Sequence, residues 1–92
     1  MMFRFITTNR FEKEYKLMQK RGKDMNKLDT VMLKLIHGET LDKRYKDHTL
    51  KGNFKDRREC HIEPDWLLVY KLSIQEKMII FERTGSHADI FE

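Results

Sequence analysis

The spacing of the apolar residues changes along the chain, and this change constrains the fold more than any other feature. Between Phe11 and Ile36 the apolar residues recur at intervals of three and four, which is the period of one helix face. From Phe54 onwards they gather in short runs separated by turn-forming residues, a pattern typical of strands. The sequence therefore predicts helices first and most of a sheet afterwards.

A strand and two helices are predicted in the first part of the chain. Residues 3–7 are short and apolar and form the first strand. Asn9, with a glutamate three residues later, resembles a capping box and begins a helix that ends near Gly22. Asp24 caps a second helix, which stops at Gly38. We expect these two helices to form a hairpin.

The second part begins with a long polar connection, for which Leu41, Tyr45 and Leu50 are the expected anchors. Three strands are predicted after it, over residues 54–62, 66–72 and 77–83. Pro64 and Asp65 supply the turn between the first two of these strands. We expect one α+β domain over residues 1–92, in which a strand, a helical hairpin and a three-stranded antiparallel meander form one sheet with helices packed on one face.

The charge distribution indicates a polyanionic partner. The chain has 19 Lys and Arg against 15 Asp and Glu, which gives a net charge of +4. Residues 1–23 hold seven basic and two acidic side chains, so the positive field belongs to the first third of the chain. Taken singly, each of Lys13, Lys16 and Lys20 fits a solvated helix face as well as it fits a binding surface. As a group they predict a surface that attracts phosphates.

Cysteine usage and hydropathy predict a soluble protein of the cytoplasm. Cys60 is the single cysteine, which excludes an internal disulfide and suits a reducing compartment. No stretch approaches the roughly 20 apolar residues that span a bilayer, and the opening residues lack the apolar segment of a signal peptide.

Four histidines are the main candidates for chemistry. His37 ends the second predicted helix, where an imidazolium favours the negative end of the helix dipole. His48 lies in the polar connection. His61 lies near a strand end, four residues before Asp65 across a turn, so these two side chains are expected to approach each other. His87 follows an apolar strand, at the rim of the predicted sheet.

These groups suit the cleavage of RNA by its own 2′-hydroxyl. That reaction needs a base, an acid and a cation for the phosphate; histidine can fill either proton role, and the guanidinium of Arg83 can bind phosphate oxygens. Trp66 and Phe91 offer flat faces on which bases can stack. No cofactor is expected, because the sequence has no glycine-rich phosphate loop.

Structural alternatives exist for several of these residues. Trp66 opens an apolar strand, which favours a place in the core. Arg83 could instead pair with Glu82, Asp89 or the C-terminal carboxylate. A zinc site can be assembled from side chains that include Cys60, His61 and His87, but the sequence lacks the spacings of known zinc motifs. We therefore expect no metal. These patterns alone do not identify RNA cleavage.

Four segments resemble the YafQ branch of the RelE toxin superfamily: DHTLKGNF at 47–54, RECHI at 58–62, PDWLLVY at 64–70 and RTGSHADIF at 83–91. The likeness covers residues 41–91 closely, whereas the two helices agree only in type and placement. Phe54 stands where relatives often carry Trp, and Ala88 and Ile90 are variants of small and aliphatic positions. The resemblance implies a ribosome-dependent messenger-RNA endonuclease of a type II toxin–antitoxin operon that cuts adenosine-rich lysine codons.

The resemblance also implies roles for individual residues. The acid–base cluster would be His48, His61, Asp65 and His87. Arg83 would hold the scissile phosphate, and Trp66 and Phe91 would stack against the message. We expect His87 to be the leaving-group acid, with His48 or Asp65 nearer the 2′-hydroxyl. The basic first helix and a second basic segment would face ribosomal RNA; this segment comprises Lys43, Arg44, Lys46 and Lys51.

The resemblance further implies a protein partner, a DinJ-like antitoxin whose complex with the toxin binds operator DNA through the antitoxin. Two alternatives remain. The first is a non-catalytic toxin of the same fold, such as a ParE-like toxin that acts on a DNA topoisomerase. Such relatives generally lack this set of histidines. The second is an adaptor that only binds RNA, in which the histidines would be replaceable without loss of effect.

Overall fold

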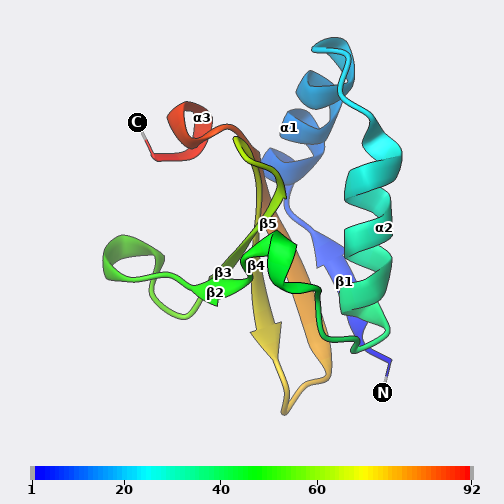
Figure 1. Cartoon of the computed structure of the whole chain (residues 1–92). Coiled ribbons are helices and arrows are strands. Elements are labelled where there is room, and N and C mark those ends of the chain that lie inside the picture. Colours follow the sequence, from blue (N-terminus) through cyan, green and yellow to red (C-terminus); the bar gives the residue numbers. More distant parts are fainter. Residues whose placement is uncertain (1, 92) are drawn as a thin grey trace.

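The computed structural model describes residues 2–91, and Figure 1 shows their arrangement. The elements are β1 (Arg4–Thr7), α1 (Asn9–Lys20), α2 (Met25–Ile36), the 3-10 turn η1 (Lys43–Tyr45), β2 (His48–Thr49), the 3-10 turn η2 (Gly52–Phe54), β3 (Arg58–Glu63), β4 (Trp66–Ser73), β5 (Met78–Gly85) and α3 (His87–Phe91). No helix in this part of the chain is long and apolar enough to cross a membrane.

The strands form one five-stranded sheet in the order β1-β5-β4-β3-β2. Strands β3, β4 and β5 are the predicted antiparallel meander, and β1 pairs parallel to β5. The short strand β2 lies in the connection that was expected to be irregular. It adds a fifth strand antiparallel to β3, with His48 opposite Glu59. The sheet is therefore mixed and one strand wider than predicted.

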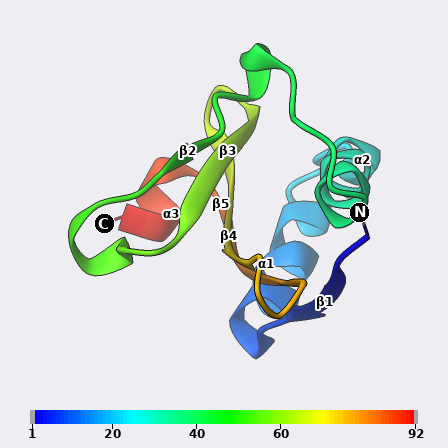
Figure 2. The same ribbon diagram turned by 90° about the horizontal axis from the view of Figure 1, so that it is seen from below.

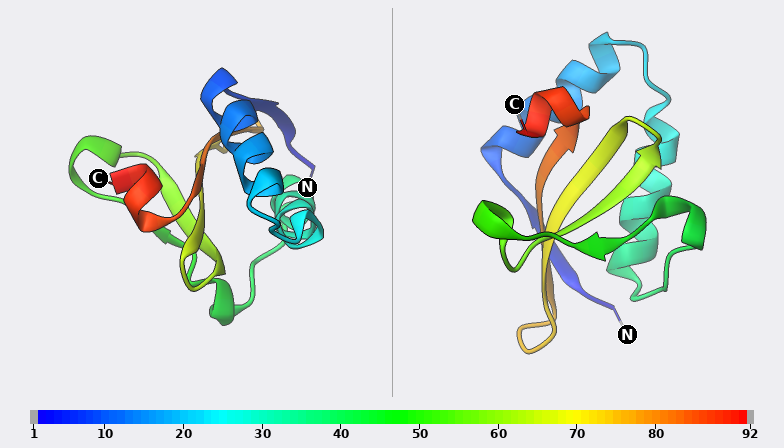
Figure 3. Two further views of the ribbon diagram at one scale, coloured as in Figure 1. Left: turned by 90° about the horizontal axis from the view of Figure 1, so that it is seen from above. Right: turned by 60° about the vertical axis from the view of Figure 1, so that its left-hand side comes forward.

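The two faces of the sheet are covered differently. Helices α1 and α2 pack on one face, as predicted, whereas α3 lies on the opposite face together with the segment that contains β2 and η2 (Figures 2 and 3). The sequence predicted only the two helices of the hairpin, so α3 and the cover that it gives to the opposite face are additions to the predicted fold. Ile90 of α3 covers Leu67 and Val69 on the opposite face, and Leu50 and Phe54 complete this smaller cluster.

The main core lies between the sheet and the helix pair. Phe11 and Met18 of α1 and Leu28 and Val31 of α2 are almost completely buried there. Each such side chain stabilises the fold by about 1.5–3 kcal/mol relative to an exposed one. Residues 66–70 of β4 are buried on both faces, because α3 covers the side that the helix pair does not. This double cover explains an uninterrupted apolar run in an antiparallel strand.

The helix ends follow the predicted chemistry with one shift. Thr8 caps α1: its hydroxyl accepts a hydrogen bond from the N–H of Phe11 at 3.0 Å, so Asn9 is the first helical residue and not the cap. Asp24 caps α2 as predicted, and accepts from the N–H of Asn26 at 3.1 Å. Gly38, just after α2, adopts the left-handed backbone that a glycine tolerates without strain.

The connection after α2 is more ordered than its polar sequence indicated. Leu41 is buried, Tyr45 packs against the main core and Leu50 against the smaller cluster, so the three predicted anchors are confirmed. The strand predicted over residues 54–62 begins only at Arg58. The chain first makes η2 and a turn at Asp56, whose φ is 72°.

Candidate active site

Three imidazoles lie in a row on the sheet face opposite α1 and α2. His48 comes from β2, His61 from β3 and His87 from the start of α3. The ring centroids of His48 and His61 are 6.4 Å apart, and those of His61 and His87 are 5.7 Å apart. His48 and His87 are half exposed, and His61 between them is more buried. The structure thus gathers three of the four predicted histidines.

Glu59 lies beneath this row and was not singled out from the sequence. Its Oε1 atom is 3.2 Å from Nε2 of His61 and 3.7 Å from Nε2 of His48, and its side chain is only 5% exposed. Glu59 and His61 are two residues apart on β3, so they point to the same face. This alternation was readable in the sequence, but the strand pairing that brings His48 opposite Glu59 was not.

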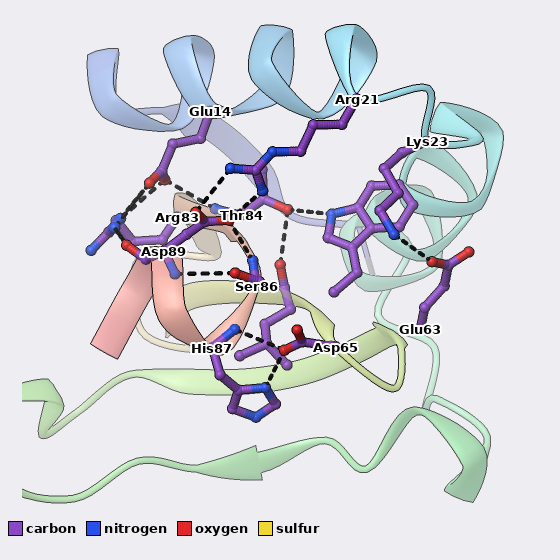
Figure 4. Close-up of polar contacts among 12 residues, drawn as sticks. Glu14, Arg21, Lys23, Glu63, Asp65, Arg83, Thr84, Ser86, His87 and Asp89 are labelled. Atoms are coloured by element: carbon purple, nitrogen blue, oxygen red, sulfur yellow. Dashed lines mark hydrogen bonds and ion pairs between the residues drawn. The ribbon is translucent and has the colours of Figure 1, made fainter. Parts of the chain in front are cut away.

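Asp65 orients His87 (Figure 4). Its polar contacts among the described residues are with His87 and not with His61, the partner expected from the sequence. Its Oδ1 atom lies 2.6 Å from Nδ1 of His87 and also accepts the backbone N–H of His87 at 2.9 Å. These hydrogen bonds, first the one from the backbone, lower the pKa of Asp65 below its ordinary value. An ionised carboxylate can only accept, so Nδ1 of His87 carries a proton and Nε2 remains for chemistry.

A hydrogen-bonded cap fixes the start of α3. The N–H of Ser86 donates to Asp89 at 2.8 Å, and the N–H of Asp89 donates to the Ser86 hydroxyl at 3.1 Å. Arg21, the residue that caps the C-terminus of α1, binds both oxygens of the same carboxylate. A Cβ atom at Gly85 would lie 2.9 Å from Cβ of Asp89, so only glycine lets α3 fold back this closely on β5. The position of His87 is therefore fixed by Asp65 through its ring and backbone N–H, and by this cap at the start of α3.

His48 is held by the backbone of its own loop. Its Nδ1 atom is 2.6 Å from the carbonyl oxygen of Lys46, a residue with the left-handed φ of 49°. A carbonyl can only accept, so Nδ1 carries the proton here too, and Nε2 faces Glu59. The two outer histidines thus share one tautomer, which each obtains from a different acceptor.

Arg83 is mostly engaged within the protein. Its Nε and Nη2 atoms donate to the carboxylate of Glu14 in α1, and Nη2 also donates to the backbone oxygen of Asp89. Its side chain is 11% exposed. None of these contacts uses Nη1. Arg83 therefore pairs with the carboxylate of Glu14, and not with that of Glu82 or Asp89, the nearby partners that the sequence suggested.

The two aromatic residues predicted to stack on RNA have different surroundings. Trp66 is completely buried, and its indole N–H donates to the hydroxyl of Thr84 at 2.9 Å. Its predicted contact with a message is wrong for this structure, and the core interpretation is confirmed. Phe91 is 41% exposed and packs edge-on against Phe54, with its ring centroid 6.4 Å from that of His87. It borders the histidine row as a stacking residue would.

The predicted basic residues lie in two separate regions. Those of the first region precede or follow β2 and are exposed: Lys43, Arg44, Lys46 and Lys51. Those of the second region are exposed on α1: Lys13, Lys16 and Lys20. Because α1 covers the other face of the sheet, the second region does not border the histidine row. The fourth histidine, His37, stands at the C-terminal cap of α2, as predicted.

The zinc set that was considered from the sequence does not form. Cys60 is fully buried in the main core, away from the histidine row, and burial raises the pKa of its thiol. A different group has ligand spacing: Glu59, His61 and His87 each offer one ligand atom, and these atoms lie within 4.8 Å of one another.

Comparisons with known proteins match almost the whole chain to one family. The family model for the bacterial toxin of type II toxin–antitoxin systems, YafQ, matches residues 3–92. The mRNA interferase toxin YafQ of Escherichia coli K12 is 49% identical over 85 residues, which cover 91% of this chain and 90% of that protein. The putative toxin YafQ of Haemophilus influenzae is 36% identical over 56 residues, which cover 59% of this chain and 55% of that protein.

Solved structures match over nearly the whole chain. The E. coli DinJ–YafQ complex contains a chain that is 46% identical, with a TM-score of 0.91, covering 99% of this chain and 100% of that one. A metal-bound toxin from Helicobacter pylori is 42% identical, with a TM-score of 0.91, covering 98% of this chain and 100% of that one.

Proposed function

We propose, because the chain belongs to the YafQ family of bacterial toxins of type II toxin–antitoxin systems, that it is an endoribonuclease that cuts messenger RNA on the translating ribosome. The relative from E. coli is named an mRNA interferase toxin. The observation that carries the proposal is the row of three histidines over one buried carboxylate. This arrangement supplies proton donors and acceptors on both sides of one place where a phosphate can sit.

The outer histidines divide the proton transfers. His87 is the acid for the leaving 5′-oxygen: Asp65 holds its tautomer and stabilises the imidazolium, as carboxylates do for catalytic histidines elsewhere. Asp65 already accepts two hydrogen bonds from His87, so we assign the base that takes the 2′-hydroxyl proton to His48 and not to Asp65. Nε2 of His48 receives that proton and Glu59 stabilises the resulting charge. Each transfer contributes about 10²–10⁴ in rate.

The remaining groups position the message. His61 lies between the outer histidines, where its ring can meet the scissile phosphate. Arg83 has one guanidinium nitrogen, Nη1, outside its contacts with Glu14 and Asp89, and this nitrogen is the donor that we assign to the phosphate. The exposed ring of Phe91 stacks on a base beside His87. The basic residues around β2 and on α1 bind ribosomal RNA, so association weakens as salt rises. Proton transfer by these side chains activates the 2′-hydroxyl without a metal ion.

We further propose adenosine-rich lysine codons as targets and a DinJ-like antitoxin as partner, with operator binding by their complex through the antitoxin. The complex of DinJ with the E. coli toxin supports the partner, because its toxin chain has the same fold over nearly its full length. An acidic segment of such an antitoxin would neutralise the basic surface that the message needs.

The test is to translate a defined message with purified ribosomes and to map the ends that the added protein produces. The proposal predicts cuts at in-frame codons only while ribosomes translate, with 2′,3′-cyclic phosphate on the upstream fragment. His87→Ala abolishes the cuts, and His37→Ala, outside the row, keeps them. Equal cutting of naked RNA, or cutting that survives both replacements, would contradict the proposal.

One observation favours a second ligand at the same place. The ligand atoms of Glu59, His61 and His87 are close enough to hold one divalent transition-metal ion, and a relative with 42% identity has been solved with metal bound. Imidazole and carboxylate suit Zn²⁺ and Cu²⁺. We propose that such an ion inhibits cleavage, because it occupies a ring nitrogen of His87, the proposed acid, and one of His61, which meets the phosphate.

A further inference from the structure

A cavity of about 530 Å³ opens beside the histidine row and takes no part in the proposed proton transfers. It lies between α2, η1 and the turn that joins β3 to β4, where the chain after α2 turns back beside the sheet (Figure 3). His61 contributes to its wall, so the cavity and the row share one side chain. Its volume is in the range of small-molecule sites.

One wall of the cavity carries side chains that can form hydrogen bonds with the edge of a flat polar ligand. Asn26 and Thr30 lie one turn apart on α2 and both line the cavity. The Asn26 amide offers a donor and an acceptor side by side, which is the pair that recognises the N6 and N7 edge of adenine. The spacing of four residues places the hydroxyl of Thr30 beside that amide.

The opposite wall can stack a base and hold a phosphate. Arg44 lies over the ring of Tyr45 at 4.9 Å, and its Nη2 atom donates to the Tyr45 hydroxyl at 2.9 Å. This contact keeps the guanidinium plane in one orientation, and such planes stack on nucleobases. On the first wall the ammonium group of Lys27 forms an ion pair with Glu63 at 3.0 Å. The positive charge available to a phosphate therefore comes from Arg44 and Lys46 on the opposite wall.

We propose that this cavity is a subsite for the adenine of the message nucleotide next to the cleaved phosphate. The inference rests on the proposed function, and it adds what that function lacks, a structural source of codon preference. With the phosphate at the histidine row, the neighbouring nucleotide passes His61 and enters the cavity. Its base lies on Arg44 and its edge meets Asn26.

A binding experiment tests the subsite without any cleavage. Adenosine 3′-monophosphate is titrated into the isotope-labelled full chain, and amide chemical shifts are followed. The expected result is a set of shifts at Asn26, Thr30 and Tyr45 that inorganic phosphate and ribose 5-phosphate do not reproduce. These shifts are lost in Asn26→Ala and kept in Asn9→Ala, which removes the same side chain from the first turn of α1. Equal shifts with inorganic phosphate, or none at these residues, would overturn the subsite.

A second arm measures codon preference on translating ribosomes. Messages that differ only in the base beside the cleaved bond are cut by wild type, Asn26→Ala, Arg44→Lys and Asn9→Ala. Loss of the amide contact lowers the preference for adenosine over guanosine by about tenfold or more. Asn9→Ala keeps the wild-type ratio. An unchanged ratio in Asn26→Ala would contradict the subsite and leave the proposed function standing. A wild-type protein that cuts no message would contradict the proposed function, and the subsite would then be decided by the titration.

Discussion

Glu59 and His61 are two residues apart on β3 and point to the same face of the sheet, where Oε1 of the carboxylate lies 3.2 Å from Nε2 of the imidazole. The same oxygen faces His48 at 3.7 Å, so one buried charge serves two rings from neighbouring strands. A buried carboxylate is costly unless it is compensated, which makes Glu59 the electrostatic centre of the row.

Replacing Glu59 by Gln keeps its size and removes its charge. We expect single-turnover cleavage to fall by at least about tenfold, because the protonated imidazoles of the transition state lose their counter-ion. Glu76→Gln, an exposed glutamate far from the row, is the matched control and should cut at the wild-type rate. A fully active, folded Glu59→Gln protein would remove Glu59 from the mechanism.

Replacing Asp65 by Asn should remove the contact that fixes the protonation of the His87 ring. The amide lacks the negative charge that stabilises the imidazolium, which is the acid form of His87, and by donating to Nδ1 it would disfavour the proton on that atom. Cleavage should fall by about 10² or more, while the unfolding midpoint changes little because Asp65 is an exposed turn residue. In the double variant with His87→Ala the losses should not multiply, since the two residues act as one unit. Multiplicative losses would show independent roles.

The sequence predicted those parts of the fold that depend on local pattern. Helices appear where apolar residues recur at three and four, and the meander appears where short apolar runs alternate with turns. The partners of the site residues did not follow from local pattern, because they are set by strand pairing and by the return of α3. Asp65 is 22 positions from His87, and Glu14 is 69 positions from Arg83.

Two departures from the expected fold and site have separate physical causes. A C-terminal segment of five residues is too short for a helix signal in the sequence, and tertiary packing of Ile90 stabilises it instead. Trp66 in β4 points to the other face, where it is fully buried in the main core beneath the helix pair and cannot stack on RNA. The resemblance implied a message contact for Trp66, whereas its contribution in this structure is to the core.

Trp66→Phe tests that correction. The smaller ring leaves the hydroxyl of Thr84 without its indole donor and leaves a partial void, which together should lower the free energy of unfolding by about 1–3 kcal/mol. Denaturant unfolding measures this loss. Under conditions where the variant is folded it should cut messages at close to the wild-type rate. A stable variant with little activity would restore Trp66 to the message contacts.

Asp89 makes the stability of the site depend on pH. Hydrogen bonds from Arg21 and Ser86 hold the pKa of Asp89 well below its ordinary 3.8, so folding favours the ionised form. Its contribution is complete above pH 3.8 and is lost as the pH falls through the folded-state pKa. Asp89→Asn should therefore be less stable than wild type at pH 7, with the difference shrinking in acid. Glu76→Gln should show no such convergence, and a constant difference for Asp89→Asn would refute the linkage.

Added Cu²⁺ or Zn²⁺ should stop cleavage and raise the unfolding temperature of the purified protein. The ion binds through Glu59, His61 and His87 in the folded state only, so it stabilises that state by mass action. Protein freed of metal by a chelator before it meets ribosomes should cut at full rate. The rise should vanish in Glu59→Gln and persist in His37→Ala, whose histidine lies outside the row at the end of α2. A rise that depended on His37, or inhibition without any rise, would place the ion elsewhere. Both effects should weaken as the pH falls, because protons compete with the metal for the imidazole nitrogens.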